Sequence, residues 1–189
     1  MLKKDVTWSL KRNWVTTISL IRHLTGTKNT FFTTGGRVPT LGDRSNLPYC
    51  DATIMEIQRL ACVAPGGIPH VANEDGYLAG YKIPKGTMLL YNIYKFHMDG
   101  DYWKEPEAFN PDRFLDGRKE QFIPYGMGKR ICMGESLARN ELFIFSTLIL
   151  QNFKIDLPIC HEKPDPQKDD LGITRAPKPF YVNISLREL

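Results

Sequence analysis

One stretch in the last third of the chain joins a cysteine between two glycines to a long apolar run. Cys132 lies between Gly128 and Gly134 and two residues after Arg130. The run that follows, about residues 133–151, is apolar almost all round in its second half and predicts a helix roughly 28 Å long. Such a helix needs partners on every side. The other helices of this chain are too few to cover it, so the pattern predicts that the chain is part of a larger fold.

The chemistry of this stretch depends on the state of Cys132. The free N–H groups and the dipole at the start of a helix stabilise a thiolate. Gly128 and Gly134 leave bare backbone against which a flat, bulky group could lie. The guanidinium of Arg130 suits a carboxylate. Together these features describe a socket for the iron and the propionates of haem. A lone cysteine is more often a buried and unreactive residue, and on this stretch alone both interpretations stay open.

Composition and cysteine spacing exclude several other classes. With 189 residues, 42% hydrophobic and 24% charged, the chain is long enough for one globular domain with a sizeable core. A net charge of +4 is too small to indicate nucleic acid by itself. The four cysteines are scattered without a Cys-x-x-Cys pair, which favours free thiols over a zinc ribbon or a disulfide framework. No stretch reaches the ~18 apolar residues that a bilayer requires, so we expect no membrane span in this chain.

Turn residues and apolar spacing predict a helix in the middle of the chain. The helix begins at Pro48 and ends before residues 65–67, with Ile54, Ile57 and Leu60 at helical spacing. Glu56 and Arg59 share one face of this helix, and taken alone they predict an exposed ion pair.

The segments after this helix are predicted to be mostly extended or irregular. Residues 77–81 and 87–91 predict the strands of a small hairpin, joined by the turn-forming residues 82–86. Residues 99–124 are rich in proline, glycine and aromatic residues and predict a long loop with a function. His97 precedes that loop, and a lone histidine is more often structural than a ligand.

The two ends of the chain differ in how much their sequence indicates. At the C-terminus, Phe180, Val182, Ile184 and Leu186 alternate with more polar residues, which predicts a strand. Residues 1–34 carry no decisive pattern and stay unassigned.

Three signals follow one another in a fixed order: Glu56-x-x-Arg59, then Pro-Asp-Arg-Phe at residues 111–114, then the cysteine loop. In this order they resemble the C-terminal part of a cytochrome P450, nearest to the microsomal family-2 type. The loop pattern of that family is Phe-x-x-Gly-x-Arg-x-Cys-x-Gly. Its positions fall here on Tyr125 in place of the usual Phe, and on Gly128, Arg130, Cys132 and Gly134.

The resemblance implies a fold and a domain organisation. The fold is mainly α with small β-hairpins. This chain would hold only the C-terminal, proximal-haem part of that fold, so the fold would be incomplete. The resemblance covers residues 35–189, and residues 1–34 do not resemble the family.

The resemblance also implies roles for individual residues. Cys132 would be the axial thiolate ligand of the haem iron. Arg130 and His97 would pair with the haem propionates. The remaining residues expected to bind the cofactor are Tyr125, Gly128 and Gly134. Glu56, Arg59 and Arg113 would form the structural triad behind the haem, a charge cluster that is tolerable when buried only if it is fully paired.

The activity that the resemblance implies is that of a haem-thiolate monooxygenase, which inserts one oxygen atom from O2 into an apolar organic substrate. Its electrons would come from NADPH-cytochrome P450 reductase at the cytosolic face of the endoplasmic reticulum membrane. Residues 64–70 and 172–177 match segments that line the substrate pocket of the family. Lys129 and Arg139 would lie near the face where the reductase docks.

One expected part of the family's site has no counterpart in this sequence. The oxygen-activating helix should precede Gly35, and residues 1–34 do not resemble it. The alternative functions are therefore a non-catalytic haem-binding fragment or an inactive truncated one. We expect the isolated chain to bind haem weakly if at all.

Overall fold

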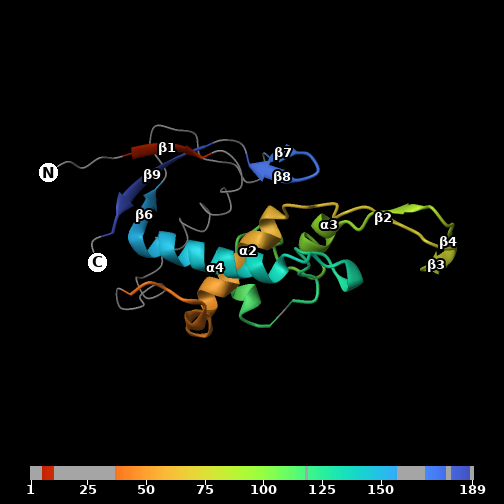
Figure 1. Ribbon diagram of the computed structural model, residues 1–189, viewed down its shortest axis with the longest axis horizontal. Helices are drawn as coiled ribbons and strands as arrows, with labels where there is room; N and C mark the ends of the chain where they lie inside the picture. The colour runs from red at the N-terminus through yellow and green to blue at the C-terminus, as the bar shows by residue number, and fades with distance from the viewer. Residues whose placement is uncertain (1–5, 11–36, 118, 157–168, 178–179, 188–189) are drawn as a thin grey trace.

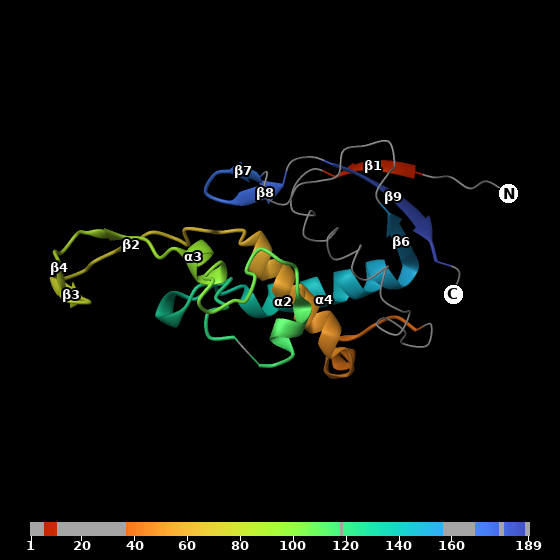
Figure 2. The ribbon, with the colours of Figure 1, turned by 180° about the vertical axis from the view of Figure 1, so that it is seen from behind.

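The computed structural model describes residues 6–10, 37–117, 119–156, 169–177 and 180–187 (Figure 1). A three-stranded sheet lies at one end of these residues, the two longest helices cross in the middle, and an arm of short strands extends at the other end (Figures 1 and 2). The helices are α2 (Pro48–Ala61), α3 (Ile93–His97) and α4 (Glu135–Asn152), with 3-10 helices η2 (Leu41–Asn46), η3 (Pro111–Phe114) and η4 (Gly128–Arg130). The strands are β1 (Val6–Leu10), β2 (His70–Val71), β3 (Gly76–Leu78), β4 (Tyr81–Ile83), β5 (Met88–Leu89), β6 (Phe153–Asp156), β7 (Asp169–Leu171), β8 (Arg175–Pro177) and β9 (Phe180–Leu186).

All strand pairs are antiparallel, and β9 is the central strand of the sheet β1-β9-β6. The predicted C-terminal strand is thereby confirmed. Phe180 and Val182 are buried, while Tyr181 between them is exposed. They form a cluster with Leu150 of α4 and Ile155 of β6. Strand β1 comes from the stretch that the sequence left unassigned, and residues 11–34 lie outside the described residues.

The predicted hairpin exists, but its turn was placed wrongly. The turn lies at Ala79 and Gly80, where both φ angles are positive (49° and 86°), the geometry of a tight hairpin turn, and it joins β3 to β4. The expected turn at residues 82–86 is also formed, since the N–H of Thr87 donates to the carbonyl of Pro84 at 3.1 Å. That turn leads into β5, which pairs with β2 instead of with the preceding strand.

Helix α2 begins at Pro48 as predicted and ends at Ala61, followed by Cys62 as the capping residue in the left-handed conformation (φ 38°). Its predicted apolar stripe is only partly buried, because Ile54 is buried whereas Ile57 is half-buried. Glu56 and Arg59 are fully buried instead. The exposed ion pair that their spacing alone predicts is therefore wrong.

Helix α4 packs on the described residues through one face only, although its second half was predicted to need partners on every side. Phe143, Thr147 and Leu150 are buried, whereas Leu142 and Phe145 are exposed, Phe145 at 57%. Phe143 contacts Cys50 and Ile54 of α2 and so joins the two long helices. The described residues thus cover one side of α4 and leave an apolar side open.

The long loop predicted at residues 99–124 is confirmed in the described residues as a series of turns around η3. Trp103, Phe114 and Phe122 are buried in it and pack against Ala52 and Met55 of α2. This aromatic cluster fixes the loop on α2 directly before the cysteine stretch begins.

Candidate haem-binding site

The candidate ligand Cys132 is exposed three residues before the first residue of α4. Its main-chain N–H donates to the carbonyl of Tyr125 at 3.0 Å, and its carbonyl accepts the N–H of Glu135 at 3.2 Å. The first bond closes the loop and the second joins the loop to the helix. The sulfur therefore lies beside the start of α4, 3.8 Å from where a Cβ of Gly134 would be.

The surroundings of the thiol are apolar and open. Met127, Ile131 and Met133 are all exposed, at 57%, 44% and 102%. Gly128 has a φ of +69°, and a Cβ added there would meet no atom within 4 Å. A flat apolar group could therefore approach the loop backbone beside the sulfur.

The charge beside the thiol is positive and unneutralised. Arg130 is exposed and forms no ion pair with any residue that the structure describes. Lys129 is exposed as well. Arg139, by contrast, pairs with Glu135 at 2.8 Å one helical turn away. An accessible soft sulfur, an apolar rim and an unpaired guanidinium fit the iron, the ring and the carboxylates of haem.

Tyr125 is contacted at three points. Its hydroxyl accepts a hydrogen bond from the side-chain amide of Gln58 on α2, and its ring lies 5.2 Å from the guanidinium carbon of Arg139. Its carbonyl accepts the N–H of Cys132. Burial raises the pKa of the Tyr125 hydroxyl; the Gln58 hydrogen bond and Arg139 oppose the rise, and the nearby charges of Glu135 and Cys132 add to it.

Two residues near the loop were missed from the sequence. Gln58 is 67 positions from Tyr125, and no local pattern relates them. Tyr91 places its hydroxyl 2.8 Å from where a Cβ of Gly126 would lie, and its ring meets that of His70 edge-on at 5.4 Å. The sequence signal that could have indicated close contacts here is the pair of glycines Gly126 and Gly128, both of which adopt positive φ angles.

His97 lies in the interior, and within the described residues its ring is hydrogen-bonded to neither Cys132 nor Arg130. Its ring is fully buried, stacks on Phe122 and accepts the N–H of Ile123 at Nε2, 3.1 Å away. Burial, together with the charge of Arg59, lowers the pKa of His97 to about 4. The neutral ring thus carries its proton on Nδ1, which is buried and has no partner among the described residues.

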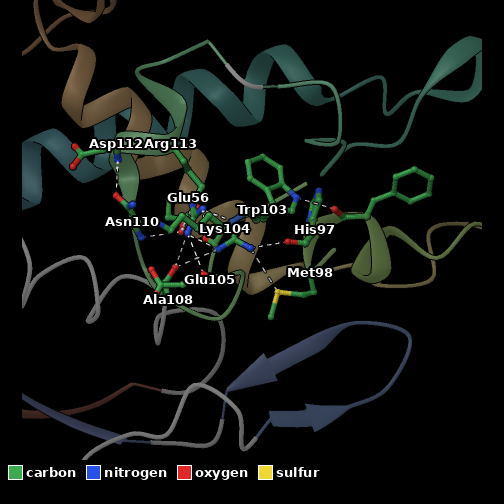
Figure 3. Close-up of polar contacts among 12 residues, drawn as sticks. Glu56, His97, Met98, Trp103, Lys104, Glu105, Ala108, Asn110, Asp112 and Arg113 are labelled. Atoms are coloured by element: carbon green, nitrogen blue, oxygen red, sulfur yellow. Dashed lines mark hydrogen bonds and ion pairs between the residues drawn. The ribbon is translucent and has the colours of Figure 1, made fainter. Parts of the chain in front are cut away.

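Glu56, Arg59 and Arg113 meet in a single buried cluster. Figure 3 labels Glu56 and Arg113 in this cluster. The carboxylate of Glu56 accepts from Arg59 at 2.7 and 2.8 Å, from Arg113 at 3.2 Å, and from the N–H of Asn110 at 2.9 Å. The carboxylate of Glu56 is therefore the shared acidic partner of both buried guanidiniums.

The remaining donors of the two guanidiniums are satisfied by main-chain carbonyls. Arg59 donates to His97 at 2.6 Å, and Arg113 donates to Lys104 at 2.9 Å and Ala108 at 3.1 Å. Both guanidinium carbons also lie within 6 Å of the Trp103 ring, at 5.3 and 5.8 Å. The cluster ties α2 to the loop that leads to Cys132. Its one carboxylate balances only one of the two guanidinium charges, and the neutral main-chain carbonyls accept the other N–H groups of both arginines.

The two segments predicted to line a substrate pocket lie next to one another. The main-chain N–H of Arg175 in β8 donates to the carbonyl of Val63, 2.9 Å away, directly before residue 64. The guanidinium of Arg175 also reaches the carbonyl of Leu60 and stacks 4.8 Å from the Tyr94 ring. Ile173 at the tip of the β7–β8 hairpin is 92% exposed.

None of the helices in the described part of the chain is long and apolar enough to cross a bilayer. The same residues hold no cluster of three or more histidine, cysteine or acidic side chains that could bind a metal ion. A lone cysteine ligand to a cofactor iron does not need such a cluster.

The fold and the fit of the cysteine loop define a class, that of haem proteins. Residues 29–184 match the model of the family described as Cytochrome P450, and the chain belongs to this family. The predicted family is thereby confirmed, and haem is the cofactor of the family.

Named relatives extend the match. The chain is 47% identical over 156 residues to human cytochrome P450 2U1 and 42% identical over 156 residues to rat cytochrome P450 2B12, covering 80% of this chain in both cases. It is 42% identical over 159 residues to the steroid 17-alpha-hydroxylase/17,20 lyase of Squalus acanthias, again over 80% of this chain. The matched part is 28%, 32% and 31% of the three relatives, so the chain spans about a third of their length or less.

Solved structures show the same partial fold. A zebrafish cytochrome P450 with abiraterone superimposes with a TM-score of 0.83 at 36% identity over 93% of this chain and 42% of the solved one. The structure with progesterone gives 0.83 at 38% identity, over 90% and 41%. The predicted fold class, an incomplete P450 fold, is confirmed.

Proposed function

We propose that this chain supplies the proximal half of a haem-thiolate monooxygenase site, with Cys132 as the residue that would bind the haem iron. The supporting observation is the exposed Cys132 thiol at the start of α4, between an apolar rim and the unpaired Arg130. When bound, haem supplies the iron chemistry that transfers one oxygen atom from O2 to an apolar organic substrate.

Each residue of the site has a proposed task. Cys132 would hold the haem iron through its sulfur. Arg130 binds one propionate, and the unpartnered Nδ1–H of His97 is the donor available to a second one. Tyr125, Gly128 and Gly134 form the surface beneath the cofactor.

The buried Glu56 cluster has an indirect, structural role and does not bind the cofactor. Glu56 binds Arg59 on its own helix and Arg113 of η3. We propose that this triad holds α2 and the loop before Cys132 in one arrangement, and that it contacts no substrate.

The substrate and the redox partner follow from the family. The relative named as a steroid 17-alpha-hydroxylase and the zebrafish structures with progesterone and abiraterone support an apolar substrate. The residues that would line its pocket are 64–70 and 172–177. Lys129 is exposed and Arg139 is half-buried in its ion pair with Glu135, and we assign these two basic residues to the face that docks NADPH-cytochrome P450 reductase at the cytosolic face of the endoplasmic reticulum membrane.

A second candidate function is haem binding without catalysis. It is favoured by the open side of the site, since Met133 and Leu137 are exposed at 102% and 63%. The described residues therefore supply the sulfur side of the site, while the opposite side is left uncovered.

The test is reconstitution of the full chain with haemin, reduction, and addition of carbon monoxide. We expect a Soret band at the position characteristic of thiolate ligation in the fraction that binds, and its loss in Cys132→Ala. Weak binding lowers the height of the band and leaves its position unchanged. No binding at saturating haemin, or the same band in Cys132→Ala, would overturn the proposal.

Catalysis is tested separately with reductase, NADPH and a lipophilic substrate. Product formation by the chain that depends on Cys132 supports the monooxygenase function. A thiolate-type band without product supports the second candidate instead.

A further inference from the structure

Gln58 connects α2 to the cysteine loop through one side-chain hydrogen bond. Its amide Nε2 donates to the hydroxyl of Tyr125 at 2.5 Å. Gln58 is half-buried and directly precedes Arg59, whose side chain is fixed by Glu56 and by the carbonyl of His97. The amide is therefore presented from a part of α2 that cannot easily shift.

Tyr125 passes this constraint to Cys132. The carbonyl of Tyr125 accepts the N–H of Cys132. Tyr125 is therefore hydrogen-bonded to Gln58 through its hydroxyl and to Cys132 through its main chain. The ring between these two points lies under Arg139, which Glu135 holds by an ion pair. A displacement of Tyr125 would therefore displace Cys132 as well.

The loop between Tyr125 and Cys132 needs such a constraint. Gly126 and Gly128 both have positive φ angles, at 80° and 69°. Glycine populates many backbone conformations, so a loop that contains two of them is weakly specified by its own backbone. Within the described residues, η4 adds a single turn through the 3.2 Å hydrogen bond from Ile131 to Gly128.

We propose that Gln58 is a positioning residue for Cys132 and acts through the hydroxyl of Tyr125. The hydroxyl departs from the loop pattern that the chain resembles, which has Phe at this position, and a phenyl ring offers Gln58 no oxygen. The consequence for haem ligation rests on the proposed function. The hydrogen-bonded connection from Gln58 to Cys132 stands on the structure alone.

The test uses four variants of the full chain and one control. Gln58→Met keeps the length of the side chain and removes the amide, and Tyr125→Phe removes only the hydroxyl. The other two are the double variant and Gln58→Glu, whose carboxylate can accept the Tyr125 O–H. Tyr81→Phe, at a tyrosine that is 75% exposed in the β3–β4 hairpin, is the matched control.

The first measurement is amide hydrogen exchange in the peptide that contains Cys132. Loss of one neutral hydrogen bond corresponds to roughly two- to tenfold faster exchange. We expect this acceleration in Gln58→Met and in Tyr125→Phe, no further acceleration in the double variant, and near-normal exchange in Gln58→Glu and Tyr81→Phe. Unchanged exchange in both single variants, additive effects in the double variant, or equal acceleration in β6 and β9 would overturn the proposal.

The second measurement is the carbon monoxide spectrum of the reconstituted chain, read as the fraction of bound haem with the thiolate-type Soret band. We expect this fraction to fall in Gln58→Met and Tyr125→Phe and to recover in Gln58→Glu. If the unsubstituted chain shows no such band while the exchange pattern holds, the proposed function fails and the positioning role of Gln58 stands. An unchanged fraction in both single variants overturns the role of Gln58 in ligation and leaves Cys132 as the ligand.

Discussion

The imidazole of His97 accepts the main-chain N–H of Ile123 at 3.1 Å, although the two residues belong to different segments of the chain. The ring is fully buried and also stacks on Phe122, 5.8 Å away between centroids. A protonated ring would lose the acceptor at Nε2 and carry a charge in the interior beside Arg59. His97 therefore supports the entry to the cysteine loop only while it is neutral.

The stability of the chain should accordingly depend on pH through His97. The pKa of the ring is about 4 in the folded chain against 6.5 in a free histidine, because of burial and the Arg59 charge. Between these values the unfolded chain binds a proton that the folded chain does not, so stability falls as pH falls from about 6.5 to 4. The loss amounts to about 3 kcal/mol.

The measurement is urea denaturation of the unsubstituted chain and of His97→Gln from pH 7 to pH 4. The glutamine can accept the Ile123 N–H but does not titrate. The free energy of unfolding of the unsubstituted chain, minus that of His97→Gln, should therefore fall by about 3 kcal/mol between pH 7 and pH 4. The hydrogen bond from Arg37 holds the pKa of Asp43 below its usual value, so protonation of Asp43 lowers the stability of the chain only below the usual carboxyl range. This effect is the same in both proteins. Parallel curves for the two proteins would show that His97 is solvated in solution.

Glu56→Gln should destabilise the chain more than any exposed charge substitution. Removing the carboxylate charge leaves Arg59 and Arg113 buried without a counter-ion, which costs about 3–5 kcal/mol. The control is Asp75→Asn, since Asp75 and Lys82 form an ion pair with both side chains 59% exposed and the asparagine can still accept the main-chain N–H of Lys85, and we expect a change below about 1 kcal/mol there. Urea denaturation checks both, and similar midpoints for the two variants would refute the buried state of the cluster.

Local patterns explain which parts of the fold and site could be predicted. The positions of Gly128, Arg130, Cys132 and Gly134 are encoded within a few residues, so the loop and the helix after it could be anticipated. The apolar period of α2 likewise predicted a helix, but not that Glu56 and Arg59 would lie deepest. Their burial depends on partners 38 to 57 positions away, and spacing within α2 carries no information on those.

Non-local pairing explains what was missed. The turn chemistry of residues 84–86 is as strong in the sequence as that of Ala79 and Gly80, and only the pairing of β5 with His70 and Val71 decides between them. Gln58 carries no signal at all, because a half-buried glutamine on a helix is usually solvated. Its partner Tyr125 stood out only as a departure from a pattern.

Gly126→Ala should show that the loop backbone and Tyr91 fit closely. With φ at +80°, any residue with a Cβ is strained by about 1–2 kcal/mol, and the new atom would lie 2.8 Å from the Tyr91 hydroxyl. Gly80→Ala, at φ +86° with no atom within 4 Å, has the strain without the overlap. We expect Gly126→Ala to be the more destabilising by about 1 kcal/mol or more.

The overlap can be separated from the strain in a Tyr91→Phe background. Removing the hydroxyl leaves 3.7 Å to the next ring atom, an ordinary contact, so Gly126→Ala should then cost no more than Gly80→Ala. Denaturation of the four proteins gives the coupling free energy. A coupling of zero would mean that Tyr91 moves away from the loop in solution.

Phe143 and Phe145 are two positions apart on α4 and offer a direct test of which face of the helix is covered. Phe143 is fully buried between Cys50 and Ile54 of α2, whereas Phe145 is 57% exposed. Phe143→Ala should lower the free energy of unfolding by about 3–5 kcal/mol. Phe145→Ala should change it by less than about 1 kcal/mol, because most of the ring already contacts water. Equal losses would mean that the outer face of α4 is covered in solution by protein other than the described residues. The loss at Phe145 should in that case depend on protein concentration if the cover is a second copy of this chain.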